Sequence, residues 1–261
     1  MDLNLSGKTA VVCGSTQGIG LAAAQQVASQ GASIILIARN EEKLKEAMTS
    51  LDTSKGQSHS YLTADFSKPG DLREKLSGFM EGKEVHILVN NTGGPAGGPA
   101  NEADIEEYRN AFNQHLVCNQ ILVQAVRDKM KAAGYGRIIN VISTSVKQPL
   151  DNLGVSNTIR GAVANWSKTL ANELGQFNIT VNNVLPGATD TVRLKSIIEN
   201  KSAKTGKSYE EILEQMSNAS PMKRIAKPEE VANAIGFLAS PAASYINGIN
   251  VPVDGGRTKS L

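Results

Sequence analysis

The sequence predicts an α/β fold, a doubly wound parallel sheet with helices on both faces. Short runs rich in Val and Ile alternate along the chain with longer segments of helical periodicity. The short runs are apolar throughout, not at every second residue, which is typical of parallel strands covered on both sides. No linker, internal repeat or low-complexity tract divides the 261 residues, so we expect a single domain over 1–261.

The predicted elements follow one another in the order that βαβ units require. We also expect two short amphipathic helices within 188–220, either as a lid over a ligand site or as an ordinary core-facing pair. The predicted strands cover residues 9–13, 33–38, 85–90, 137–142 and 179–184, and the predicted helices cover 19–30, 41–50, 71–80, 102–131 and 156–175.

Composition restricts the partners that this chain can have. Its 27 Lys and Arg against 25 Asp and Glu give a formal net charge of +2, too small for nucleic-acid binding. No apolar run reaches the roughly 18 residues of a membrane helix, and Asp2 and Asn4 interrupt any secretory signal. Cys13 and Cys118 have no disulfide or zinc-site spacing. We therefore expect a cytoplasmic protein with buried, reduced thiols, no metal and a small-molecule substrate.

A glycine-rich turn joins the first strand to the first helix. Glycines allow the backbone to turn tightly and approach a pyrophosphate, and N–H groups at the helix N-terminus hold the anion. Alone, such a turn can be a plain strand-to-helix connection, but its position between a strand and a helix favours a dinucleotide site. The residues predicted to bind the cofactor here are Gly14, Ser15, Thr16, Gly18, Ile19 and Gly20.

The second strand ends on Ala38, Arg39 and Asn40, where an NAD site needs Asp or Glu for the ribose hydroxyls. A cation without an acid beside it suits a 2′-phosphate, so the sequence favours NADP(H) over NAD(H). We predict that Arg39 and Asn40 lie at this end of the cofactor. The alternative is a solvated arginine at the sheet edge.

Further segments, together with the glycine turn, resemble the short-chain dehydrogenase/reductase family over nearly the whole chain. They are Asp65 in Thr-Ala-Asp-Phe, the Asn-Asn-Thr-Gly run at 90–93, Pro-Gly at 186–187, Pro-Glu-Glu-Val-Ala at 228–232 and Val-Asp-Gly-Gly at 253–256. Thr92 stands where the family usually has alanine. The resemblance implies a Rossmann-type domain and extends the predicted cofactor site to Asp65, Phe66, Asn91, Thr92, Gly93, Arg160, Pro186, Gly187 and Thr189.

The same resemblance exposes a departure at the catalytic positions. The family uses an Asn, a Ser, and a Tyr followed four positions later by a Lys; here only Ser143 matches. His115 stands at the Asn position, Ser156 at the Tyr position and Arg160 at the Lys position. A serine is too short and too weak an acid to replace the phenol, and a guanidinium does not release its proton. The usual proton relay is absent.

Two side chains could replace that relay. His115 has a reference pKa of about 6.5 that suits acid/base work, and Lys147 lies four residues beyond Ser143. A packed helix histidine bonded to a backbone carbonyl and a solvated loop lysine are the alternatives, and water could also supply the proton. We expect Thr144, Lys147, Gln148 and the 188–220 segment to select the substrate.

Three functions are compatible with the sequence. The first is an NADP(H)-dependent oxidoreductase that interconverts a carbonyl and a secondary alcohol, with Ser143 as oxyanion donor. The second is an NADP-binding protein without redox turnover, and the third is a lyase or isomerase that uses the polarised-carbonyl pocket. The retained cofactor segments favour the first and second functions over the third, whereas the missing Tyr and Lys favour the last two over the first. We place the oxidoreductase first because every segment that contacts NADP is retained. The resemblance also implies a homotetramer or homodimer assembled through the helices at 102–131 and 156–175.

Overall fold

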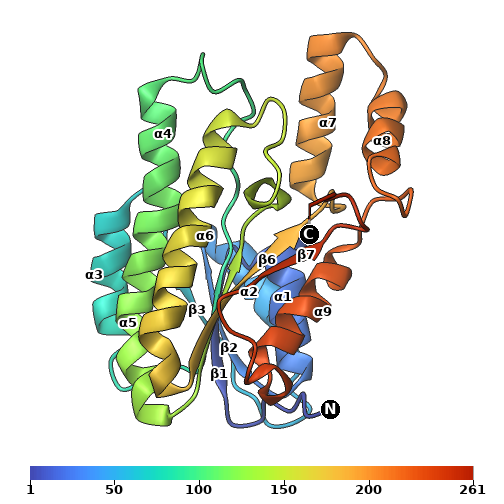
Figure 1. The fold of residues 1–261 in the computed structure, drawn as a ribbon. Helices are drawn as coiled ribbons and strands as arrows, with labels where there is room; N and C mark the ends of the chain where they lie inside the picture. Colours follow the sequence, from blue (N-terminus) through green and yellow to red (C-terminus); the bar gives the residue numbers. More distant parts are fainter. Residues whose placement is uncertain (261) are drawn as a thin grey trace.

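The computed structural model describes residues 1–260 as a seven-stranded parallel sheet between two layers of helices (Figure 1). The strand order is β3-β2-β1-β4-β5-β6-β7. This confirms the predicted doubly wound α/β fold. The strands are β1 (Thr9–Cys13), β2 (Ser33–Ala38), β3 (Ser60–Thr63), β4 (Ile87–Asn90), β5 (Gly136–Val141), β6 (Ile179–Pro186) and β7 (Asn250–Val253).

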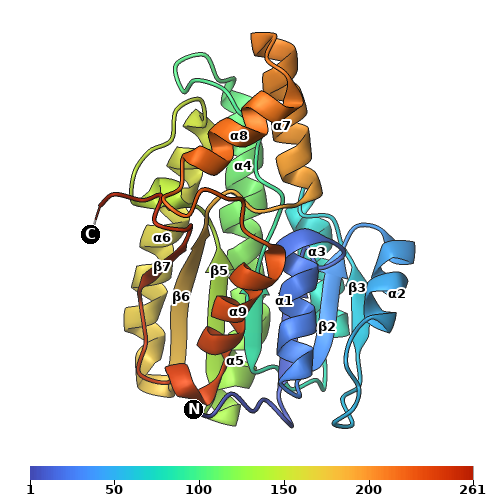
Figure 2. The same ribbon diagram turned by 90° about the vertical axis from the view of Figure 1, so that its right-hand side faces the viewer.

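Helices cover both faces of the sheet (Figure 2), and each face has its own hydrophobic core. One face is covered by α1 (Gly18–Ser29), α2 (Glu41–Thr49) and α9 (Pro228–Ala239). The other is covered by α3 (Pro69–Phe79), α5 (Cys118–Ala133) and α6 (Gly154–Leu174). The central strands lie between two apolar layers, which explains why most of their residues are apolar on both faces. Both cysteines are buried, unpaired thiols, and burial raises the pKa of the Cys118 thiol to about 12.

The single helix predicted over 102–131 is interrupted. The structure has α4 (Ile105–Phe112), a π-helical turn (Asn113–Val117) and then α5. The Asp104 side chain accepts a hydrogen bond from the backbone N–H of Glu106 and caps α4. A π turn adds one residue without ending the helix, so apolar periodicity does not reveal it. His115 lies inside this turn.

Three elements were not predicted: β3, β7 and α9. The two strands are the edges of the sheet, and their residues are mostly half-buried instead of fully buried. Pro252 lies inside β7. An edge strand tolerates a proline, which has no backbone N–H, because it pairs with a strand on one side only. Edge strands therefore lack the continuous apolar run that identified the central strands.

The 188–220 segment contains two helices, α7 (Val192–Thr205) and α8 (Tyr209–Asn218). Both project beyond the sheet at the end where the top of α4 also lies (Figures 1 and 2). Their apolar side chains form a separate small cluster around Leu194, Ile198 and Ile212. No helix within residues 1–260 is long and apolar enough to cross a membrane.

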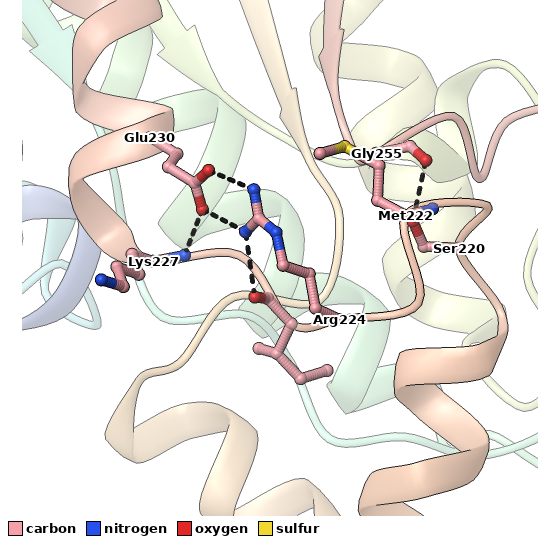
Figure 3. Close-up of polar contacts among 7 residues, drawn as sticks. Ser220, Met222, Arg224, Lys227, Glu230 and Gly255 are labelled. Atoms are coloured by element: carbon pink, nitrogen blue, oxygen red, sulfur yellow. Dashed lines mark hydrogen bonds and ion pairs between the residues drawn. The ribbon is translucent and has the colours of Figure 1, made fainter.

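The base of this helix pair is tied to the rest of the molecule by polar contacts (Figure 3). The two guanidinium nitrogens of Arg224 donate to the two carboxylate oxygens of Glu230, at 2.6 Å and 2.5 Å. Ser220 Oγ donates to the carbonyl oxygen of Gly255 at 2.8 Å. The chain leaving α8 is therefore held both to the start of α9 and to the segment that follows β7.

A row of asparagines crosses the sheet beside the predicted ligand end. Asn90 Nδ2 donates to Asn140 Oδ1 at 2.8 Å, and Asn140 Nδ2 donates to Asn183 Oδ1 at 3.1 Å. Asn183 Nδ2 in turn donates to Asn250 Oδ1 at 2.8 Å. Each pair occupies directly opposed positions on adjacent strands, from β4 to β7. This row fixes the relative positions of the strand ends that carry the site.

Candidate active site

The strand order reverses between β1 and β4, and a doubly wound sheet binds its ligand at the carboxyl ends of such strands. The glycine turn after β1 and Asn91 after β4 are in contact there. Asn91 Nδ2 donates to the carbonyl oxygens of Cys13 at 3.3 Å and Gly14 at 3.4 Å. A Cβ on Gly20 would lie 2.1 Å from the Gly14 oxygen, so only glycine fits at position 20.

The N-terminus of α1 has the properties of a phosphate-binding site. Its N-cap, Gln17, makes no side-chain capping bond, and the first turn contains no acidic residue. The N–H groups and the positive end of the helix dipole are thus available to an anion. A Cβ on Gly18 would lie 2.9 Å from Thr191 Cγ2, so the residue before α7 packs against this turn. The turn therefore fits the pyrophosphate of a dinucleotide.

Arg39 is exposed at the end of β2 and forms no ion pair with another described residue. A backbone hydrogen bond from Ser67 and the nearby Arg39 lower the pKa of Asp65, which is therefore ionised at neutral pH.

Two other predicted cofactor residues have local structural contacts. Asn40 Oδ1 accepts the N–H of Lys43 at 2.8 Å and caps α2. Phe66 is buried, and its carbonyl oxygen accepts from the Cys118 thiol.

The Pro-Gly segment, which the family resemblance places in the cofactor site, lies at the end of β6. Pro186 is the last residue of β6, and the N–H of Gly187 donates to the Val253 carbonyl oxygen at 2.9 Å. A Cβ on Gly187 would lie 2.8 Å from Asp254 Cα, so this backbone approach requires glycine. Thr189 is buried, and its hydroxyl donates to the Gly187 carbonyl oxygen.

Ser143 follows β5 at the same end of the sheet. Its Oγ accepts the N–H of Ser145 at 3.1 Å, and it donates no hydrogen bond within residues 1–260, so its proton is available to a ligand. Lys147 follows the short 3₁₀ turn that begins at Thr144. Ser156 is half-buried in the first turn of α6, one helical turn before Arg160.

His115 is only 1% exposed, and its Nδ1 lies 2.6 Å from the hydroxyl oxygen of Thr92. Its other ring nitrogen, Nε2, is buried without a partner among the described residues. Burial and the nearby Arg160 lower the pKa of the imidazole to about 2. The ring is therefore neutral at physiological pH. One alternative considered from the sequence was a packed helix histidine bonded to a backbone carbonyl. The histidine is packed, but the partner of its Nδ1 is the side chain of Thr92.

Arg160 is 7% exposed, and its Nη1 donates to the carbonyl oxygen of Val141, two residues before Ser143. Burial and a second arginine, Arg193, lower its pKa to about 10, so the guanidinium remains charged at neutral pH. Among residues 1–260, no carboxylate forms an ion pair with it. Arg160 is thus a buried cation at the catalytic end of the site.

Sequence reasoning did not identify Arg193. It lies in the first turn of α7 and donates from Nη2 to the Pro95 carbonyl oxygen at 2.6 Å, which joins α7 to the glycine-rich loop after β4. No motif marks this residue, and the lid segment and the loop are almost a hundred positions apart. The sequence showed only an arginine within the predicted lid segment, and the fold alone brings it near Arg160.

Comparison with known proteins gives a family for this arrangement. The family model described as enoyl-(acyl carrier protein) reductase matches residues 14–258. The NADPH-dependent reductase BacG of Bacillus subtilis is 31% identical over 259 residues, which cover 98% of this chain and 100% of that relative. The chain belongs to the short-chain dehydrogenase/reductase family. This confirms the resemblance that the sequence motifs predicted.

Solved structures of short-chain dehydrogenases/reductases agree with this assignment. L-Sorbose reductase from Gluconobacter frateurii, complexed with NADPH and L-sorbose, is 33% identical with a TM-score of 0.92, over 100% of both chains. YwfH, an NADPH-dependent reductase involved in bacilysin biosynthesis, is 31% identical with a TM-score of 0.89, over 98% of this chain and 100% of its own. Escherichia coli K12 7alpha-hydroxysteroid dehydrogenase is also 31% identical, over 100% of this chain and 98% of its own.

Proposed function

We propose that this chain transfers a hydride between NADP(H) and a small molecule, interconverting a carbonyl and a secondary alcohol, through an atypical proton relay. The chain is an NADP-dependent oxidoreductase of the short-chain dehydrogenase/reductase family. The observation that carries the proposal is Ser143, whose hydroxyl proton is available at the same end of the sheet as the dinucleotide groove. When bound, the cofactor supplies or accepts the hydride.

In this proposal the protein holds the cofactor through segments from several parts of the chain. The uncapped N-terminus of α1 holds the pyrophosphate, and Arg39 contacts the 2′-phosphate. Asp65 lies at the adenine end, and the Pro186–Gly187 segment lies at the nicotinamide end. Arg160 bonds the nicotinamide ribose in place of the family lysine. The name of BacG and the NADPH in the L-sorbose reductase complex agree with this cofactor.

Ser143 then stabilises the negative charge that develops on the carbonyl oxygen, because its Oγ accepts the Ser145 N–H and its own proton remains available to donate. His115 is a poor proton source, since its imidazole is neutral and would have to release an N–H proton. Ser156 is too weak an acid, and Arg160 stays protonated. Lys147 or a water molecule therefore supplies the proton.

The replacement Ser143→Ala tests this function. We expect kcat to fall by about two decades while the Kd for NADPH stays within twofold, because the hydroxyl acts only on the developing oxyanion. Ser143→Thr keeps a hydroxyl on an extended residue and should retain part of the activity. NADPH oxidation is measured with a carbonyl compound found by screening. Undiminished turnover in Ser143→Ala would place the chemistry elsewhere.

A second function is favoured by one observation, the loss of the tyrosine and lysine at positions 156 and 160. It is an NADP-binding protein without redox turnover, acting as a sensor or a partner subunit. Fluorescence titration with NADPH, combined with a broad panel of carbonyl compounds, separates the two. Tight NADPH binding, without NADPH oxidation in the presence of any panel member, supports this second function.

The assembly and compartment belong to the same proposal. We infer a homodimer or homotetramer that pairs α5 and α6 with those of another copy, as family resemblance implies. Unpaired, buried Cys13 and Cys118 suit a reducing compartment, so we place the protein in the cytoplasm. Sedimentation velocity at several protein concentrations tests the assembly, and a monomer at all concentrations would contradict it.

A further inference from the structure

We propose that the substrate carries an anionic group, a carboxylate or a phosphate, that binds at Arg160 and Arg193. This inference rests on the proposed function and names the substrate class of the same site. The two residues come from different elements, α6 and α7, and meet beside the glycine-rich loop that follows β4. The anionic group would anchor the substrate while Ser143 contacts its carbonyl.

Gly94 shows how close the two guanidinium groups are. A Cβ built on Gly94 would lie 3.7 Å from Arg160 Nη2 and 4.0 Å from Arg193 Nη2. The Nη2 atoms of Arg160 and Arg193 are therefore at most about 7.7 Å apart. Gly94, which has no side chain, lies next to both. A carboxylate or phosphate has oxygens on opposite sides and can accept from two such donors at once. The absence of a side chain at position 94 leaves space beside them.

The charges around this pair are unbalanced. Arg160 is buried and Arg193 is exposed, and neither forms an ion pair with a carboxylate among residues 1–260. Each has one hydrogen bond from a terminal nitrogen to a backbone carbonyl oxygen, on Val141 and Pro95 respectively. Like charges at short range, one of them buried, are unfavourable unless an anion joins them. The fold thus maintains a cationic site that lacks its counter-charge.

The cofactor has other sites for its own phosphates. Its pyrophosphate fits the N-terminus of α1, and its 2′-phosphate fits Arg39 at the end of β2. Arg160 instead bonds to Val141, two residues before Ser143, at the reactive end of the site. The nicotinamide end of the cofactor carries an uncharged amide. An arginine has five N–H donors, so Arg160 can bond the nicotinamide ribose and a substrate anion together. We therefore infer that an anion at this position comes from the substrate.

Binding to the NADP⁺ complex of the full-length protein provides the test. The probes are aliphatic, cyclic and aromatic keto acids, each paired with its methyl ester, and a set of keto phosphates paired with the corresponding alcohols. We expect at least one anion to bind about ten- to a hundredfold more tightly than its neutral partner, which is the range for hydrogen bonds to charged groups. The carboxylate and phosphate sets identify which group the site accepts.

Arg193→Gln should remove at least about tenfold of that preference, and Arg193→Lys should restore part of it. The matched control is Lys195→Gln, which removes the same charge from an exposed position on α7 and should leave the preference unchanged. NADPH affinity without substrate should stay the same in all three variants. A parallel tenfold loss of NADPH affinity in Arg193→Gln would assign this arginine to the cofactor and overturn the proposal.

The remaining outcomes separate this inference from the proposed function. If anions bind selectively but no NADPH is oxidised, the anion site stands and the redox function fails. If neutral esters are reduced as fast as the acids, the redox function stands and the anion site fails. Binding of none of the anions at up to millimolar concentrations would also overturn the anion site.

Discussion

Thr92 and His115 form a hydrogen-bonded pair across the site, with the hydroxyl oxygen 2.6 Å from Nδ1. Both residues differ from the family pattern, Thr92 replacing alanine and His115 replacing asparagine. From the sequence these were two separate departures. The structure links the two departures, because the Thr92 hydroxyl forms the hydrogen bond that the buried Nδ1 of His115 requires.

This pairing predicts strong coupling between the two positions. Thr92→Ala leaves a buried ring nitrogen without its partner and should lower the free energy of unfolding by about 1–3 kcal/mol. In a His115→Asn background, the same Thr92→Ala change should cost much less, because the ring nitrogen is gone. Urea unfolding of the parent, both single variants and the double variant measures the coupling. Additive effects would show that the contact contributes no stability.

Arg39 governs the choice of cofactor in the proposed function. Its guanidinium is exposed at the end of β2 and pairs with no carboxylate among residues 1–260, as a 2′-phosphate contact requires. We expect Arg39→Asp to lose about one to two decades of NADPH over NADH preference, since a charge-assisted bond contributes about 1.5–3 kcal/mol. Arg73→Asp on α3 is the exposed control. Equal NADPH and NADH affinities in the parent protein would contradict this role.

At the scale of elements, burial decided what the sequence could predict. The five strands at the centre of the sheet are mostly apolar and almost fully buried, and all of them were predicted, whereas both edge strands were missed. The π turn at 113–117 was missed for another reason. The turn changes the backbone hydrogen bonds within a continuous helix by adding one residue to a single turn. The spacing of apolar side chains over 102–131 is too coarse to reveal that one residue.

The base of the α7–α8 pair gives a prediction for this element. Arg224→Met removes the two bonds to Glu230 and should speed hydrogen exchange of the amides in 217–227 by up to about fivefold, since an exposed ion pair contributes about 0–1 kcal/mol. The control is Lys75→Met, which removes the exposed 3.1 Å pair with Asp71 on α3. Exchange in 217–227 that matches the control would show that the ion pair does not hold this segment.

At the scale of the whole molecule, the site is assembled from strand ends spread along the entire chain. Local motifs predict its cofactor half, because glycine turns and Asn-Asn-Thr-Gly need no distant partner to be identified. The catalytic half could not be completed from the sequence, because only the fold brings Arg193 near Arg160 and Thr92 within hydrogen-bond distance of His115. Burial also changed the chemistry of His115, and no spacing rule predicts that change.

Burial of His115 makes the stability of the molecule depend on pH, and the loss begins at a higher pH than carboxylate titration does. The imidazole has a pKa of about 2 in the folded protein and about 6.5 when unfolded. Between these values the unfolded chain binds one more proton than the folded chain, so stability increases with pH. The contribution is complete above pH 6.5 and is lost progressively as pH falls toward 2. Burial lowers the pKa of His86 as well, which acts in the same direction.

Unfolding by urea between pH 7 and 5, at one fixed protein concentration, should therefore show a decreasing free energy of unfolding. Below pH 6 His115 alone contributes a slope approaching 1.4 kcal/mol per pH unit, the value for one proton. His115→Asn should remove that slope and leave the part due to His86. Glu230, whose pKa the Arg224 bond lowers to about 2, affects stability only at lower pH, where its carboxylate protonates in the unfolded chain. An unchanged slope in His115→Asn would mean that the imidazole is already protonated in the folded protein at pH 5, and that a solvent path or a bound anion reaches its Nε2.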